Sequence, residues 1–128
     1  MTVIATDTQR LSNVVKRELW PEAGYCRLQV TAGETADYKV GTVLGKITAT
    51  GKFIKAVQTA VDGSAVAAAV VMEDKSVVDG TGVLALVRGP AAISRDALVL
   101  DASYNLDAEK DAVYAAFEAL GIMTLVTV

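Results

Sequence analysis

Alternating and continuous apolar segments predict that most of this chain folds as β-strands. Val40–Phe53 alternates β-branched residues with glycines and ends in a Thr-Gly-Lys turn, which predicts a strand followed by a tight return. Asp62–Met72 begins with an Asp-Gly-Ser turn and becomes a continuous apolar run, as expected for a strand that is buried on both faces. Neither segment gathers reactive side chains, so we expect both to pack and pair.

Shorter segments of the same kind predict further strands. The expected strands are Tyr25–Thr31, Tyr38–Thr48, Lys52–Val57, Ala65–Met72, Val83–Val87, Ala91–Ile93, Ala97–Leu100 and Ile122–Val128. One segment is predicted to be helical, because Asp107 suits an N-cap and Gly121 suits the position after a helix end. The pattern therefore indicates one β-dominated domain over residues 25–128, preceded by an N-terminal arm over residues 1–24.

The arm differs from the rest of the chain, because it mixes polar residues with isolated apolar ones. Between Leu11 and Leu19 the apolar residues recur at helical spacing, which predicts a short helix that stops before Trp20–Pro21. Two interpretations stay open: a partly ordered terminus, or an arm that becomes ordered on a partner, which the Trp favours. The residues expected to contact such a partner are Val3, Ile4, Leu11, Val14, Val15, Leu19 and Trp20.

Composition limits the function. The chain has 128 residues, 52% of them hydrophobic but only 5% aromatic, which predicts a single domain with a core of small side chains. Twelve basic and fifteen acidic residues are spread evenly, so we expect no nucleic-acid partner. The longest apolar run, Ala65–Met72, is far shorter than the roughly 20 residues of a membrane-spanning helix. With no secretory signal in view, we expect a soluble protein with no membrane partner.

The residue inventory also argues against an enzyme. The chain has no His, which removes the commonest general base and metal ligand, and its single Cys26 lies in an alternating segment typical of a small packed residue. Gly41–Lys46 lacks the spacing and the following Ser or Thr of a phosphate loop, so its glycines indicate a bend or bulge. Asp79–Gly82 is a turn. We expect no catalytic residue, no cofactor and no metal site.

In this order and spacing, the segments resemble the lambda-type head decoration proteins of tailed bacteriophages, also called capsid-stabilising or cement proteins. The resemblance covers roughly residues 40–122 and leaves out the arm. It rests on Val40–Phe53, on Asp62–Met72, on Leu86-Val-Arg-Gly-Pro-Ala91 and on an Ala-rich helix that leads to Ile122. Its most specific part is Val43-Leu-Gly-Lys-x-Thr-x-Thr-Gly-Lys52, followed by an Asp-Gly-Ser turn.

The resemblance implies a mainly β (α+β) fold: a compact barrel-like or β-tulip domain with one short C-terminal helix and an extended N-terminal arm. It implies a virion protein, made in the host bacterial cytoplasm, that binds the outer surface of the expanded capsid. There it would form a homotrimer at local threefold axes and stabilise the capsid against internal DNA pressure. The implied partners are other copies of the chain and the major capsid protein, to whose strands the arm would add.

Two other functions stay open. Glu73–Ser76 resembles the Asp-Lys hairpin at which lipoyl-carrier domains are modified, with Lys75 as the modified residue. This alternative requires Lys75 on an exposed tip between two strands, and such carriers are shorter and lack the C-terminal helix. The other alternative is a different phage structural component, such as a tail or fibre subunit, because these share a β-rich composition.

Overall fold

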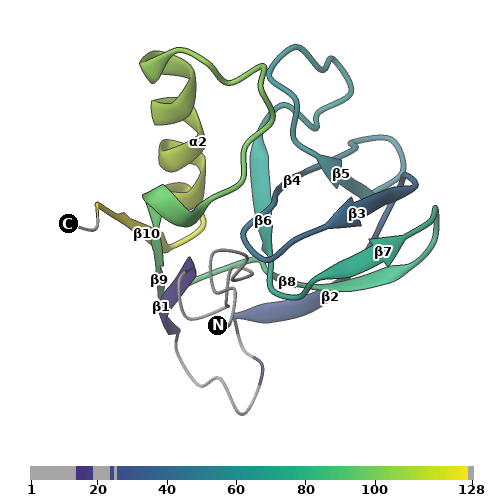
Figure 1. The fold of residues 1–128 in the computed structure, drawn as a ribbon, viewed down its shortest axis with the longest axis horizontal. Coiled ribbons are helices and arrows are strands. Elements are labelled where there is room, and N and C mark those ends of the chain that lie inside the picture. The colour runs from purple at the N-terminus through teal and green to yellow at the C-terminus, as the bar shows by residue number, and fades with distance from the viewer. Residues whose placement is uncertain (1–13, 19–23, 25, 127–128) are drawn as a thin grey trace, which may run out of the picture.

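The computed structural model describes residues 14–18, 24 and 26–126, apart from the side chain of Asp96, and it is mainly β (Figure 1). Its strands are β1 (Val15–Glu18), β2 (Arg27–Thr31), β3 (Ala36–Tyr38), β4 (Val43–Lys46), β5 (Phe53–Lys55), β6 (Ala67–Val71), β7 (Lys75–Val77), β8 (Gly82–Leu86), β9 (Ala91–Ser94) and β10 (Ile122–Leu125). A short 3-10 helix, η2 (Arg95–Ala97), follows β9, and the α-helix α2 (Asp107–Ala119) precedes β10. The predicted fold class, mainly β with one short C-terminal helix, is confirmed.

The larger sheet has five antiparallel strands in the order β2-β8-β6-β4-β5. β6 is central, and its burial fits the continuous apolar run that predicted it. An isolated bridge between Ala32 and Phe53 joins the chain just after β2 to β5, the opposite edge strand. The sheet therefore curls toward a barrel at one end without closing along its length.

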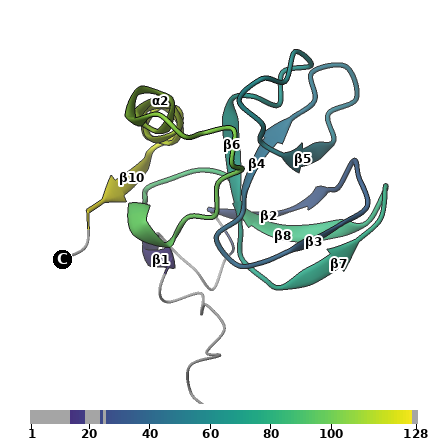
Figure 2. The same ribbon diagram turned by 45° about the horizontal axis from the view of Figure 1, so that its top comes forward.

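A second sheet and the helix lie beside the first sheet (Figures 1 and 2). The strands of this second sheet lie in the order β1-β9-β10, with β9 antiparallel to β1 and parallel to β10. α2 contacts both β10 and β6, and it buries Val113 and Phe117. β3 and β7 form a separate antiparallel pair.

Two hydrophobic clusters fill the interior, and small side chains dominate both. The first cluster joins the two sheets and the helix and includes Val14, Cys26, Ile93 and Phe117. The second lies inside the curl of the larger sheet around Tyr38 and includes Leu44, Val71 and Val83.

Several predicted elements differ from the observed ones. Tyr38–Thr48 is two strands, because the backbone turns at Gly41 with a φ of 96° and separates β3 from β4. Ala97–Leu100 is no strand: η2 ends there, and Val99 makes only an isolated bridge to Thr42. The sequence does not predict β7, because the polar residues from Glu73 to Ser76 indicate only a turn.

Two predictions about local geometry are confirmed. The ladder between β4 and β6 shifts register between Leu44 and Gly45, and a Cβ atom on Gly45 would lie 1.9 Å from the carbonyl oxygen of Ser64. Gly45 therefore serves backbone packing at an irregularity of the strand, as the spacing indicates. Gly121 has a φ of 84° just after the helix end, the left-handed conformation expected at that position.

The N-cap of α2 lies one residue earlier than predicted. Leu106 is the N-cap, and its backbone N–H donates to the carboxylate of Glu109 over 3.1 Å. Asp107 is the first helical residue, where its negative charge still favours the positive end of the helix dipole. None of the described helices is long and apolar enough to span a membrane.

Candidate functional site

The best-defined candidate site is the place where the N-terminal segment joins the domain. β1 pairs with β9, with Val15 opposite Ile93 and Glu18 opposite Ala91, and the register shifts between Val15 and Arg17. Val14, just before β1, is fully buried in the first core cluster. The predicted helix is therefore wrong for Val15–Glu18, because pairing with β9 and burial of Val14 outweigh the helical spacing of the apolar residues.

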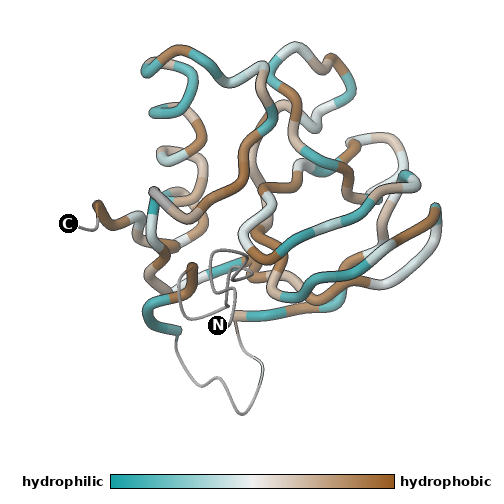
Figure 3. The backbone as a smooth tube through the Cα atoms, viewed as in Figure 1, coloured by the Kyte–Doolittle hydropathy of each residue, from teal (hydrophilic) through white to brown (hydrophobic). Residues whose placement is uncertain are grey.

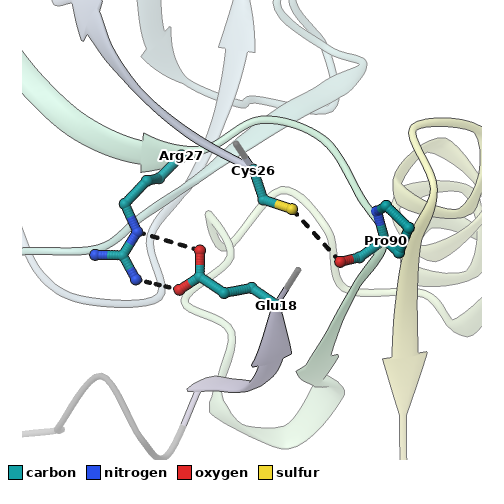
Figure 4. Close-up of polar contacts among 4 residues, drawn as sticks. All are labelled: Glu18, Cys26, Arg27 and Pro90. Carbon is teal, nitrogen blue, oxygen red and sulfur yellow. Dashed lines mark hydrogen bonds and ion pairs between the residues drawn. The ribbon is translucent and has the colours of Figure 1, made fainter. Parts of the chain in front are cut away.

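An ion pair ties β1 to the larger sheet (Figure 4). Arg27 Nε donates to Glu18 Oε2 over 3.1 Å, and Arg27 Nη2 donates to Glu18 Oε1, so the pair is bidentate. The Glu18 side chain is only 7% exposed and that of Arg27 is 26% exposed. The hydrogen bond to Glu18, more than any other cause, raises the pKa of Arg27 above its ordinary value. Such a desolvated, two-point contact fixes geometry better than an exposed pair would.

Cys26, next to Arg27, contacts the residue that precedes β9. Its thiol Sγ lies 3.4 Å from the carbonyl oxygen of Pro90, the residue before β9, and its own carbonyl accepts a hydrogen bond from Val87 N–H. Cys26 is fully buried, which confirms the prediction of a small packed residue. β1, β2 and the start of β9 thus converge on residues 26 and 27 (Figure 4).

The structure places two of the seven predicted contact residues within the domain. Val14 is buried, and Val15 is half-buried in β1. The other five lie outside the described residues: Val3, Ile4, Leu11, Leu19 and Trp20. The Glu18–Arg27 pair is not predicted from the sequence, because β1 and β2 belong to different sheets and no local pattern indicates that charges nine positions apart will meet.

A second surface of interest surrounds β10. Met123 is 60% exposed and Val126 is 68% exposed, and Leu120 just after α2 is also exposed. Figure 3 shows β10 and the residue that follows it as a largely apolar stretch at the outside of the molecule. We call Leu120, Met123 and Val126 the β10 patch.

Lys75 does not occupy the position that a carrier would need. It begins β7, and its Nζ donates to the carbonyl oxygen of Gly82 over 2.7 Å. The strands on either side do not form a hairpin around it, because β6 pairs with β4 and β8 whereas β7 pairs with β3. The exposed tip that the carrier alternative requires is therefore not present at Lys75, and that alternative loses its geometric basis.

A hollow of about 410 Å³ lies between α2 and the start of β6. Small apolar residues form much of its lining, among them Ala65, Ala67, Ala108 and Ala112. The hydroxyl of Tyr104, which also lines it, donates to the carbonyl oxygen of Ala65 over 2.8 Å. Among the described residues, no three Cys, Asp or Glu side chains are grouped so as to hold a metal ion. The lining of the hollow is thus mostly apolar and does not indicate a reaction or a specific ligand.

A family model of the bacteriophage lambda head decoration protein D matches residues 5–122. Because the match spans nearly the whole chain, the chain belongs to this family and is a structural protein of the phage capsid. The match begins at residue 5, so the expectation that the whole arm lies outside the resemblance is wrong. No protein with a curated description matches the chain.

Proposed function

We propose that this head decoration protein binds the outer surface of the expanded capsid as a trimer at local threefold axes and stabilises the capsid against internal DNA pressure. The residues ahead of β1 would dock on the major capsid protein. The family match supports the decoration role. The observation that carries the arm proposal is the fixed root: Val14 is buried, β1 pairs with β9, and Glu18 binds Arg27.

The docking segment in this proposal is the part of the arm ahead of Val14, because Val14 is buried and β1 pairs with β9. Residues 1–13 span about 43–47 Å when fully extended, which is enough to cross onto a neighbouring subunit. It includes Thr2, Val3, Ile4 and Thr6, residue types that favour strands. Addition of such a strand to a capsid sheet would supply main-chain hydrogen bonds.

The fixed root makes docking more favourable. Because β1 fixes where the docking segment begins, that segment samples a smaller volume than it would at the end of a flexible chain. Less conformational entropy is then lost when it binds. Each copy that binds the expanded capsid and not its precursor or dissociated subunits shifts the equilibrium toward the expanded form. Many copies together would then resist internal pressure.

The test is a pair of deletions assayed for binding to expanded heads. Removal of residues 1–13 should leave the urea midpoint nearly unchanged and weaken binding by roughly 100-fold, a loss typical of removing one of two linked contacts. Removal of residues 1–19 should in addition lower the urea midpoint, because it takes away Val14 and β1. Undiminished binding after the shorter deletion would contradict the docking role of the arm.

Electron microscopy of virions carrying labelled protein tests the location. Label on the outer face of the head at threefold positions is the expected result. Label on the inner face of the head, or on the tail, would contradict the proposed surface. Heads lacking the protein should lose DNA at a lower osmotic stress than decorated heads.

A further inference from the structure

One edge of the three-stranded sheet lacks the usual protection. Among the described residues, β10 pairs only with β9. Ile122–Leu125 contains no charged residue and no Pro, and its ladder with β9 runs without a register shift. Natural proteins guard exposed edge strands with charges, Pro or bulges. An unguarded edge with Met123 exposed in its middle is therefore expected to be covered.

Every other edge strand in the described part of the chain contains at least one charged residue. These residues are Lys16, Arg17 and Glu18 in β1, Arg27 in β2, Asp37 in β3, Lys55 in β5 and Lys75 in β7. The ladder between β1 and β9 also has a register shift. The lack of a guard therefore distinguishes β10 from the other edges that the structure describes.

The N-terminal segment enters the domain at the end of the sheet where β10 ends. Val15 and Thr124 both lie opposite Ile93, one on each side of β9. Because neighbouring strands lie about 4.8 Å apart, the open side of β10 is about 14 Å from Val15. Residues 7–13 span about 23–25 Å when extended, so Thr2–Thr6 can reach this side.

The strand directions also suit such a connection. β1 is antiparallel to β9 and β10 is parallel to it, so β1 and β10 run in opposite directions. A segment that precedes Val14, crosses the end of the sheet and lies along β10 would therefore run parallel to β10 and antiparallel to β1. Antiparallel strands can be joined at one end by a short connection, and residues 7–13 would supply it.

The composition of Thr2–Thr6 suits an uncharged edge. These five residues include no charged side chain, no Pro and no Gly, and four of them are β-branched. Asp7 and Arg10, the charged residues among residues 1–13, fall in the connection. An uncharged, strand-forming segment promotes aggregation when it is left uncovered. Pairing with β10 would cover this segment and the edge together.

We propose that Thr2–Thr6 covers the β10 edge of its own chain as an added parallel strand in the free protein. Attachment to β1 favours the same chain over a second copy, because a short linker gives an effective concentration of roughly millimolar. The same residues cannot pair with β10 and with a capsid strand at once, so the contact restrains the arm until the capsid replaces β10. Only this last step rests on the proposed docking of the arm.

Cross-linking of the dilute full-length protein tests the contact. Ile4→Cys is combined with Met123→Cys and treated with a short bismaleimide, while the native Cys26 is fully buried and should not react. Trypsin cuts after Arg10 and Lys110, so a cross-link within one chain joins peptides 1–10 and 111–128 in protein that stays monomeric on a denaturing gel.

The matched control combines Ile4→Cys with Val61→Cys, at a fully exposed position in the loop between β5 and β6. Residues 1–13 are long enough to bring residue 4 to either target, so an arm that is not held should react with both. The pair with residue 123 should react about 10-fold faster than the pair with residue 61, because the held arm is concentrated at β10. Equal rates would overturn the inference.

Single variants show which chain covers the edge. Ile4→Cys protein incubated with Met123→Cys protein should give no joined peptides. Joined peptides from this mixture would show that the arm of a second copy covers β10 and would overturn the assignment to the same chain. Covalent dimers of Met123→Cys alone would show that two β10 edges meet and would overturn the inference as well.

Hydrogen exchange asks the same question without a reagent. Replacement of Val3 and Ile4 together by Pro removes two successive backbone donors, one of which faces the partner strand. The β10 amides should then exchange about 5-fold faster than in the wild type, because opening of this edge no longer requires release of the arm. Thr8→Pro with Gln9→Pro, in the connection, is the control and should exchange as the wild type does. Unchanged exchange after the change at residues 3 and 4 would overturn the inference.

Binding to expanded heads separates this inference from the docking role. A cleavable cross-link between positions 4 and 123 should weaken binding about 100-fold, as removal of residues 1–13 should, and cleavage should restore it. Undiminished binding of the cross-linked protein would overturn the restraint of the arm by β10. Undiminished binding after removal of residues 1–13 would overturn the docking role, while cross-linking and exchange of the free protein would still decide whether the arm covers β10.

Discussion

Gly89 lies so close to Gly121 that a Cβ atom at position 89 would stand 1.7 Å from the carbonyl oxygen of Gly121. Two hydrogen bonds hold this approach: Gly89 N–H donates to Leu120 O over 2.9 Å, and Ala91 N–H donates to Gly121 O over 3.4 Å. The turn before β9 is thereby joined to the end of α2. Since β9 pairs with both β1 and β10, this contact positions the root of the arm and the β10 patch.

Replacement of Gly89 by Ala should destabilise the protein by about 3 kcal/mol, because backbone must move to make room for the methyl group. The urea midpoint measures this change. Gly82→Ala is the matched control, since the nearest obstacle there is the Gln29 side chain, which can rotate away. A Gly89→Ala variant as stable as Gly82→Ala would contradict the close approach.

The Glu18–Arg27 pair should contribute measurably to stability. Glu18→Ala and Arg27→Ala should each cost about 2 kcal/mol, because each leaves a largely desolvated charge without its partner. The double variant should cost less than the sum of the two, which a double-mutant cycle of urea midpoints reveals as coupling. Lys52 and Asp79, an exposed pair at 2.9 Å, provide the comparison and should show coupling of about 0.5 kcal/mol or less.

Much of this fold could be predicted from the sequence, because the apolar pattern and the turn residues indicate the same strand and helix boundaries. The Asp-Gly-Ser turn and the apolar run after it specify β6, and Gly121 specifies the end of α2. The segments that could not be predicted are those where long-range pairing decides the structure. Val15–Glu18 lies within a helical spacing of apolar residues but becomes a strand, because β9, far along the chain, offers its backbone as a partner.

The contacts of the polar segment from Glu73 to Ser76 were less predictable than the fold. The sequence from Glu73 to Ser76 indicates a solvated turn or a carrier hairpin, yet its carboxylates hold two other segments in place. Glu73 Oε2 accepts a hydrogen bond from Leu84 N–H, and Asp74 Oδ1 accepts one from Val40 N–H, both over 2.8 Å. No local pattern indicates which distant N–H group a carboxylate will meet, so the sequence could not reveal these contacts.

Removal of the Asp74 carboxylate should therefore destabilise the protein although the residue lies in a polar turn. Asp74→Ala should cost about 1.5 kcal/mol, a typical value for a hydrogen bond to a charged group. Asp74→Asn keeps an acceptor oxygen and should cost less. Equal urea midpoints for wild type and Asp74→Ala would show that water replaces the carboxylate at Val40 N–H without loss.

The Tyr38 hydroxyl should make the protein sensitive to alkaline pH. Tyr38 is 1% exposed, and its hydroxyl donates to Glu34 Oε2 over 2.7 Å. Burial, followed by the hydrogen bond to Glu34, raises the pKa of Tyr38 far above its ordinary value of 10.0. The folded protein thus retains this proton more strongly than the unfolded chain. The resulting stability is complete below about pH 10 and declines as the pH rises further.

Urea unfolding between pH 7 and pH 11 measures this dependence. Tyr38→Phe should lose about 1 kcal/mol at pH 7, where the hydrogen bond is intact, and should decline less than the wild type above pH 10. Part of the alkaline loss of stability should remain in Tyr38→Phe, because burial also raises the pKa of Tyr104. A Tyr38→Phe variant that declines as steeply as the wild type would show that the Tyr38 proton does not govern alkaline stability.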